Sequence, residues 1–189
     1  MTSTDDVRAH YEKLLGSATE EHRVNLGPLQ FEILTIPGAP YADGTTVATL
    51  GLSKHIGQEF LLACHSDQLH AKHVSLLAIV AKEQLESGAG LRRGQVLGPA
   101  GPLVPGAATE ALYVCPPAYF GPNFDPLILA DGGHVHFFWL VPIHVREARW
   151  IAVNDTPNTK TFVFEDLLVA QDPDLLDFSR PELDLGDSN

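Results

Sequence analysis

The most regular alternation of apolar and polar positions in the chain lies at residues 134–141, which read HVHFFWLV. Side chains of a strand alternate between its two faces, so one face of this segment is apolar throughout. The other face starts with His134 and His136 and is apolar in its second half. Because a strand with one face in water would keep a polar residue at every second position, we predict a central strand covered on both sides. An Asp-Gly-Gly turn at residues 131–133 precedes it, and Pro142, which lacks an N–H donor, is predicted to end it.

Shorter patterns divide the rest of the chain into strands and helices. Alternating or apolar runs predict strands at residues 22–26, 29–36, 45–52, 58–65 and 110–115, with a brief extended piece at 95–97. Helical spacing of apolar residues predicts helices from Ser3 to about Gly16 and over residues 67–87, 145–152 and 161–169. Leu69 begins the apolar stripe of the second helix, and Gly88 is predicted to end that helix. Residues 88–106 are rich in glycine and proline and predict a surface excursion.

The length of 189 residues suits one domain with a hydrophobic core. We predict that this domain covers residues 1–183 and that residues 184–189 form a disordered, acidic tail. The apolar side chains of Leu175, Leu176 and Phe178 are predicted to tie the start of the C-terminal segment to the domain.

The charge of the chain limits the classes of partner. Twenty-four acidic residues against 12 lysines and arginines give a net charge of −12. Nucleic acid is therefore disfavoured, because binding to phosphates needs clustered cations, and the only adjacent basic pair is Arg92-Arg93. No apolar run is long enough to cross a membrane and no signal-peptide pattern opens the sequence, so we expect a cytoplasmic protein. Cys64 and Cys115 lie in predicted strands and are expected to be buried thiols.

Histidines and acids offer candidate chemistry. Two groups of histidines have spacings that metal sites use: His65, His70 and His73, and His134 with His136. One hypothesis is a metal-dependent hydrolase that uses His134 and His136 with Asp131 as a nearby acid. Four carboxylates near the central strand could form an acid–base pair: Asp125, Asp131, Glu147 and Asp155. Turn formation by the aspartates and a stabilising position in the first turn of a helix for Glu147 are the commoner explanations.

Aromatic residues gather in the loop PPAYFGPNFDP, where Tyr119, Phe120 and Phe124 lie close together in sequence. Aromatic side chains in a loop either fill the core or act as contact anchors in an interface. The sequence pattern favours the first role and leaves the second open.

Five motifs occur together in a fixed order: TTVATLGLSKH, EFLLAC, FDPLILADGGHVHFFWLVPIHVREARWI, FEDLL and DLLDFSRPEL. In this order and spacing, from about residue 27 to residue 183, the chain resembles the suppressor of fused domain family. The resemblance implies an α+β fold, a single domain with a mixed central β-sheet flanked by α-helices, which agrees with the elements predicted above. It also implies a binding protein without catalytic residues. The animal member is similar to a clamp that holds a transcription-factor segment as an added strand between two domains. This chain has the length of one domain, so the clamp does not carry over, and its DGGH turn has one glycine more than the usual pattern.

Single-domain bacterial relatives resemble immunity proteins that neutralise polymorphic toxins. We therefore expect a non-enzymatic, protein-binding domain, specifically an immunity protein, that requires no cofactor or metal and whose partner is a protein such as a basic toxin domain. Binding is assigned to six residues around the central strand: Tyr119, Phe120, Phe124, Asp131, His134 and His136. Besides the metal-dependent hydrolase, the alternative is a peptide-binding module that accepts an added β-strand at a sheet edge.

Overall fold

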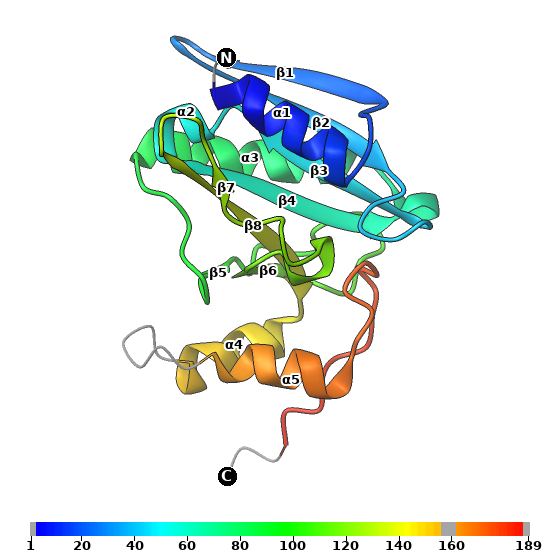
Figure 1. The fold of residues 1–189 in the computed structure, drawn as a ribbon. Coiled ribbons are helices and arrows are strands. Elements are labelled where there is room, and N and C mark those ends of the chain that lie inside the picture. Colours follow the sequence, from blue (N-terminus) through cyan, green and yellow to red (C-terminus); the bar gives the residue numbers. More distant parts are fainter. Residues whose placement is uncertain (1–2, 156–161, 187–189) are drawn as a thin grey trace.

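The computed structural model describes residues 3–155 and 162–186, and one mixed β-sheet organises them (Figure 1). Neighbouring strands follow the order β1 (Glu20–Leu26), β2 (Leu29–Pro37), β3 (Gly44–Leu50), β4 (Gln58–His65), β8 (His134–Ile143), β6 (Ala111–Cys115) and β5 (Val96–Leu97). The short β7 (Leu127–Ile128) pairs with the start of β8 and lies off this path. The β4–β8 pair is parallel and every other pair is antiparallel. The expected α+β fold with a mixed sheet is confirmed.

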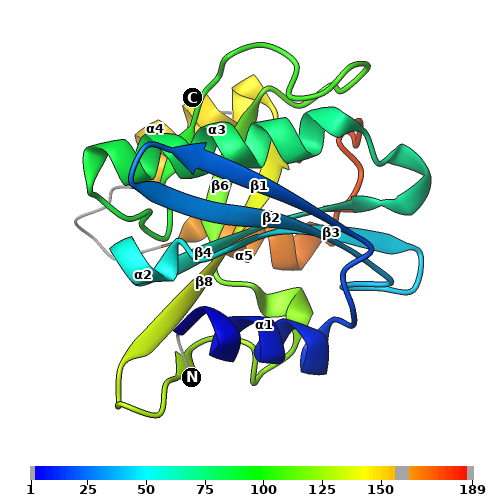
Figure 2. The same ribbon diagram turned by 90° about the horizontal axis from the view of Figure 1, so that it is seen from above.

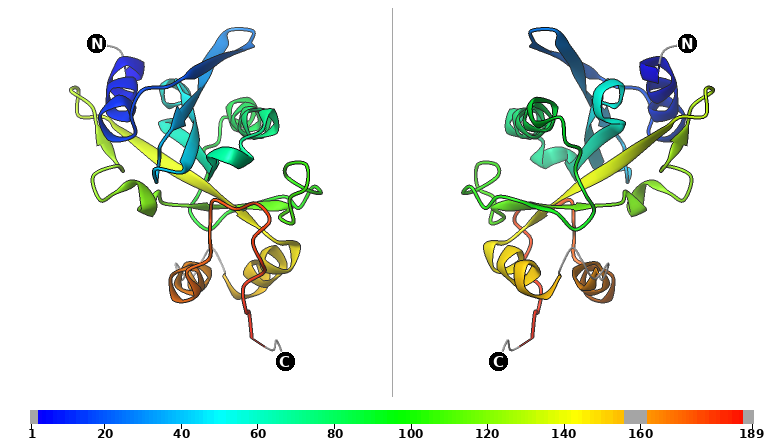
Figure 3. Two further views of the ribbon diagram at one scale, coloured as in Figure 1. Left: turned by 90° about the vertical axis from the view of Figure 1, so that its right-hand side faces the viewer. Right: turned by 90° about the vertical axis from the view of Figure 1, so that its left-hand side faces the viewer.

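Helices cover both faces of this sheet. In chain order they are α1 (Ser3–Leu14), α2 (Ser53–Ile56), α3 (Ala71–Ser87), α4 (Val145–Asn154) and α5 (Val163–Gln171). Figure 2 shows α1 and α3 on opposite sides of the sheet, and Figure 3 shows α4 and α5 below it, side by side. Two hydrophobic clusters result: one joins α1, α4 and α5 to the sheet, and the other joins α3 to its opposite face. None of the described helices is long and apolar enough to span a membrane.

The central position of β8 follows from its two apolar faces, as the alternation predicted. β8 lies between β4 and β6, and Trp139 and Leu140 are buried on its opposite faces. The predicted end at Pro142 is wrong, because the strand continues to Ile143 and Pro142 is paired with Leu112 of β6. The pairing with β4 ends at Trp139, so β8 has a partner strand on one side only at Pro142. A missing N–H donor is tolerated at such a position.

The predicted helix over residues 67–87 begins later in the structure. A 3₁₀ turn occupies Ser66–Gln68, and α3 starts at Ala71, with Leu69 outside it and exposed rather than part of a buried stripe. The reason is a cap: the side chain of His70 accepts a hydrogen bond from the Lys72 N–H, and His73 Nδ1 accepts one from the His70 N–H. A capping residue takes an extended backbone, so the helix cannot extend through it. Gly88 ends α3 in the left-handed conformation, as predicted.

The C-terminal segment returns across the domain after α5. Leu175, Leu176 and Phe178 are buried, as predicted, and the Phe178 carbonyl accepts hydrogen bonds from Thr109. Further along, Asp184 exchanges two hydrogen bonds with the Gln171 side chain. Of the predicted tail, residues 187–189 lie outside the described part of the chain.

The start of this segment is held to the end of β4 by an ion pair between His65 and Asp174, with 2.7 Å between Nε2 and Oδ2. The hydrogen bond to Asp174 raises the pKa of His65 in the folded protein. A raised histidine pKa gives stability that is fully present below the unfolded pKa of about 6.5 and is lost as pH rises through the folded pKa.

We therefore expect Asp174→Asn to lower the melting temperature at about pH 6 and to have a smaller effect at about pH 9. Thermal denaturation followed by circular dichroism at both pH values measures this difference. Asp172→Asn, a neighbouring substitution away from His65, is the control. An effect of Asp174→Asn that is the same at both pH values would contradict the ion pair.

Candidate functional site

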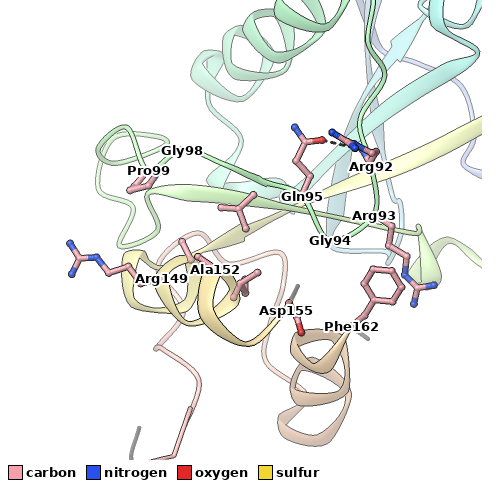
Figure 4. A pocket seen from close by; sticks show the side chains of 13 residues that line it. Arg92, Arg93, Gly94, Gln95, Gly98, Pro99, Arg149, Ala152, Asp155 and Phe162 are labelled. Atoms are coloured by element: carbon pink, nitrogen blue, oxygen red, sulfur yellow. Dashed lines mark hydrogen bonds between the residues drawn. The ribbon is translucent and has the colours of Figure 1, made fainter. Parts of the chain in front are cut away.

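A groove of about 720 Å³ lies between the β5 edge of the sheet and α4. One wall is the segment of residues 92–99, and the other is the face of α4 that carries Ala148, Ile151 and Ala152 (Figure 4). Phe162, at the start of α5, and Asp155, at the end of α4, also line it. The groove thus lies where the last strand of the sheet meets the helical layer below.

The wall formed by residues 92–99 owes its shape to a β-bulge. The Gly94 N–H donates to the Val114 carbonyl, while the Val114 N–H donates to the Gln95 carbonyl, so two residues of one strand oppose one residue of β6. Gly94 has a φ of +83°, and a Cβ there would lie 3.1 Å from the Phe162 ring. The positive φ favours glycine, and a Cβ at this position would also require the Phe162 ring to shift. The Gln58 side chain fixes the start of this wall through two hydrogen bonds with Leu91. The brief extended piece predicted at residues 95–97 corresponds to β5.

The other wall is α4, and the first turn of this helix is fixed by a buried ion pair. Glu147 accepts from the His144 N–H, which closes a capping box at the start of the helix. Its carboxylate also binds Arg180 at 2.6 and 2.8 Å, and both side chains are buried. The small side chains of Ala148 and Ala152 leave the space that forms the groove. The helix and the position of Glu147 in its first turn follow from the sequence, whereas its partner Arg180 does not.

Three arginines line the groove: Arg92, Arg93 and Arg149. The Arg93 side chain already has partners within the chain. It forms two hydrogen bonds with Glu165 at 2.9 and 2.6 Å and lies 4.0 Å from the centre of the Phe162 ring. The hydrogen bond with Glu165 raises the pKa of Arg93. In the described part of the chain, no carboxylate lies within ion-pair distance of Arg92 or Arg149. Two exposed cations therefore flank a largely apolar groove.

The acidic residue inside the groove is used by the fold. Asp155 is buried, and its carboxylate accepts hydrogen bonds from the N–H groups of Val163 and Phe164 at the start of α5. Negative charge at a helix start is stabilised by the helix dipole. Asp155 therefore positions α5, and its negative charge is directed to that helix.

The aromatic residues predicted to bind a partner lie in the core or at its edge. Phe124 is fully buried, and its ring contacts those of Phe120, Phe137 and Tyr11. Tyr119 is partly buried and packs against Trp139, which makes it the most accessible of the three predicted aromatics. The loop is held from α1 by His10.

Asp131, His134 and His136 lie on a projecting hairpin formed by β7 and the start of β8. All three are exposed, and Asp131 accepts a hydrogen bond from the Gly133 N–H within the turn. His136 lies 3.5 Å from Asp125 rather than from Asp131. The hairpin lies at the start of β8, whereas α4, which forms one wall of the groove, follows the end of that strand. The structure therefore does not bring these residues to the groove.

The histidine groups do not converge on one point. In residues 3–155 and 162–186, no three His, Cys, Asp or Glu side chains lie close enough together to hold a metal ion. His70 and His73 form the cap of α3, and His65 pairs with Asp174. Burial lowers the pKa of His73, whose ring meets the Phe178 ring edge-on at 4.7 Å between centroids.

The two cysteines are buried free thiols, as predicted. Burial raises the pKa of Cys64 to about 12, which leaves it protonated and unreactive at neutral pH.

Sequence reasoning missed the arginines of the groove. The one signal in the sequence is Arg92-Arg93, the only adjacent basic pair in an acidic chain. Arg149 gave none, because it is an ordinary polar residue on a helix until the fold places α4 beside β5.

Comparisons with known proteins place this fold. The family model described as suppressor of fused protein (SUFU) matches residues 27–181. Comparison with curated proteins gives no significant sequence match. The crystal structure of a SUFU homologue from Neisseria gonorrhoeae is similar, with a TM-score of 0.74, 19% identity and 95% of each chain covered. The Sufu–Fu complex crystal structure is also similar, with a TM-score of 0.55, 14% identity and coverage of 80% of this chain and 78% of that one. Because the family model covers most of its length, the chain belongs to the suppressor of fused protein (SUFU) family.

Proposed function

We propose that this chain is a non-catalytic protein-binding domain and that the groove between β5 and α4 is its contact site. The observation that carries this proposal is the pair of arginines, Arg92 and Arg149, that line an apolar groove in a chain of net charge −12 and form no ion pair with any residue that the structure describes. Apolar area supplies affinity, and a few charged groups supply orientation and specificity. The Sufu–Fu structure, a complex of a protein with this fold, supports the same class of function.

The partner that we propose is a toxin domain, which the chain neutralises as an immunity protein by covering its active site. Membership of the family and the acidic surface support this proposal. An acidic surface accelerates association with a basic partner, because long-range attraction raises the encounter rate. Blocking the active site of the toxin by covering it needs no catalytic group on this chain.

Co-expression of the chain with candidate toxin domains encoded by neighbouring genes, followed by growth measurement and affinity capture, tests both proposals. We expect the wild-type chain to restore growth and to recover the toxin as one stable complex. Ala152→Trp, which fills the groove, should abolish both effects. Val153→Trp is the matched control, because Val153 is the next residue of α4 and is 77% exposed.

The outcomes separate the two levels of the proposal. Capture of a non-toxic protein that depends on Ala152 would retain the binding groove and reject the immunity role. Full capture by the Ala152→Trp variant would reject the groove as the contact site. The contact would then have to lie elsewhere, and the projecting hairpin with Asp131, His134 and His136 would be the next surface to test.

A further inference from the structure

We infer that the groove is also a binding site for a small amphipathic anion, with its acidic head group beside Arg92 and Gln95 and its apolar body on the face of α4. The class of ligand is an organic acid that carries one oxyanion, such as a carboxylate, on a compact aromatic or aliphatic body. This inference goes beyond the proposed function, because the ligand is a small molecule and its binding is measured on the chain alone.

The size of the groove suits a small molecule, and its walls are formed before any ligand binds. A volume of about 720 Å³ lies within the range of about 300–1,000 Å³ that is typical of small-molecule sites. Hydrogen bonds of Gln58 with Leu91 and of Asp155 with α5 fix the surroundings. Such a site loses little conformational entropy when a ligand binds. Residues with little or no side chain line both walls and leave the space open: Gly94, Gly98, Ala148 and Ala152.

A turn at the start of the segment 92–99 supplies the polar end of the groove (Figure 4). The Gln95 N–H donates to the Arg92 carbonyl at 3.0 Å, and the Arg92 N–H donates to Oε1 of the Gln95 side chain at 3.1 Å. Because its Oε1 is used in this way, the Gln95 side chain presents its amide N–H groups as donors. Neither this amide nitrogen nor the Arg92 guanidinium is bonded to any residue that the structure describes. Two donors, one of them charged, therefore lie at one end of the groove, and an oxyanion is the group that pairs with both.

The other lining residues match an apolar body. Val96, Ile151 and Phe162 supply the larger apolar side chains. Asp155, the acidic residue of the groove, directs its carboxylate to the first N–H groups of α5. Figure 4 shows Arg149 at the opposite end of the groove from Arg92, so the two guanidinium groups do not converge on one head group. The geometry therefore favours a ligand with a single charge.

The charge of the whole chain makes a preference for anions diagnostic of this site. A net charge of −12 attracts cations to the surface in general and repels anions. Non-specific binding of an apolar molecule would therefore be strongest for a cationic form. A site that prefers the anion must owe this preference to local donors such as Arg92.

Equilibrium dialysis with three fluorescent naphthalene derivatives tests the inference. They share one aromatic body and carry a carboxylate (2-naphthoate), a neutral hydroxymethyl group (2-naphthalenemethanol) or an ammonium group (2-naphthylmethylammonium). We expect 2-naphthoate to bind the wild-type chain with a Kd on the order of 0.1 mM and the alcohol to bind about tenfold more weakly. The ammonium compound should bind more weakly than either.

Substitution of Arg92 tests the position of the head group. Arg92→Gln should weaken binding of 2-naphthoate about tenfold, to the level of the alcohol, and leave binding of the alcohol unchanged. Arg92→Lys, which keeps the charge, should retain part of the preference. Arg146→Gln is the control, because Arg146 lies on α4, is 61% exposed and is not part of the groove. It should bind all three compounds like the wild-type chain.

Substitution of Ala152 tests the position of the body. Ala152→Trp fills the groove and should abolish binding of both 2-naphthoate and the alcohol, whereas Val153→Trp, at the exposed next residue of α4, should not. Circular dichroism of both variants shows whether they are folded. The exposed Arg92→Gln variant keeps the test decisive if Ala152→Trp does not fold.

Three results would each overturn the inference: binding of the alcohol as tight as that of 2-naphthoate, unchanged affinity of Arg92→Gln for 2-naphthoate, or wild-type binding by a folded Ala152→Trp variant. A larger effect of Arg149→Gln than of Arg92→Gln would overturn the position assigned to the head group. Partner capture is a separate measurement. Failure of capture with intact binding of 2-naphthoate would reject the groove as a protein contact and retain it as a small-molecule site.

Discussion

Replacing Arg180 with methionine is expected to lower the free energy of unfolding by about 3–5 kcal/mol, because it leaves Glu147 as a buried, uncompensated charge. The Arg180 side chain is 1% exposed and Glu147 is fully buried. The guanidinium also donates to the carbonyls of Pro142 and Pro181, and Glu147 accepts from the Leu183 N–H. One substitution therefore disturbs β8, α4 and the C-terminal segment together. Urea denaturation followed by circular dichroism measures the effect.

The double variant Arg180→Met/Glu147→Met separates a lost ion pair from lost packing. It removes both charges, so it should recover a large part of the stability lost in the single variant. Arg146→Met is the control for loss of an arginine near α4, since its contact with Glu182 is exposed and 3.7 Å long. A single Arg180→Met variant within about 1 kcal/mol of the wild type would contradict the role assigned to the pair.

Phe124→Ala is expected to destabilise the fold by about 3–5 kcal/mol, because it opens a cavity in the aromatic cluster. The ring centroid of Phe124 lies 5.0 Å from that of Phe137 and 5.2 Å from that of Phe120. None of the Phe124 side chain is exposed. Thermal and urea denaturation measure the loss.

The same substitution separates the two roles that the sequence left open for this aromatic residue. If Phe124 is a core residue, Phe124→Leu should lower stability less than Phe124→Ala does, and partner capture should persist in the leucine variant. Asn123→Ala, at an exposed position in the same loop, should leave stability unchanged. Normal stability of Phe124→Ala combined with lost capture would instead identify Phe124 as a contact anchor.

The elements of this fold could be predicted wherever the information was local. β8 was predicted because one of its faces is apolar throughout residues 134–141 and the other is apolar in its second half, and the turn and helix that flank it follow from adjacent residues. The errors arose where a distant contact overrides a local rule. Pro142 does not end β8, because the strand lacks a second neighbour at that point. The helix α3 starts later than predicted because two histidine side chains cap it.

The candidate site could not be predicted in the same way. The groove exists because residues 92–99 and α4, about 50 positions apart in sequence, lie beside each other. Glu147 was predicted to be in the first turn of a helix, and this position is correct. Its buried partner lies 33 residues further along, and no local pattern links the two.

This separation has a consequence for biosynthesis. A chain emerging from the ribosome exposes Glu147 well before it exposes Arg180, and in the interval the carboxylate has no buried partner. Burial of the first turn of α4 before then would leave the Glu147 carboxylate without its partner at a cost of several kcal/mol, so we expect this turn to pack after the segment that carries Arg180 has emerged. Formation of the groove wall on α4 is thus coupled to translation of a region that does not line the groove.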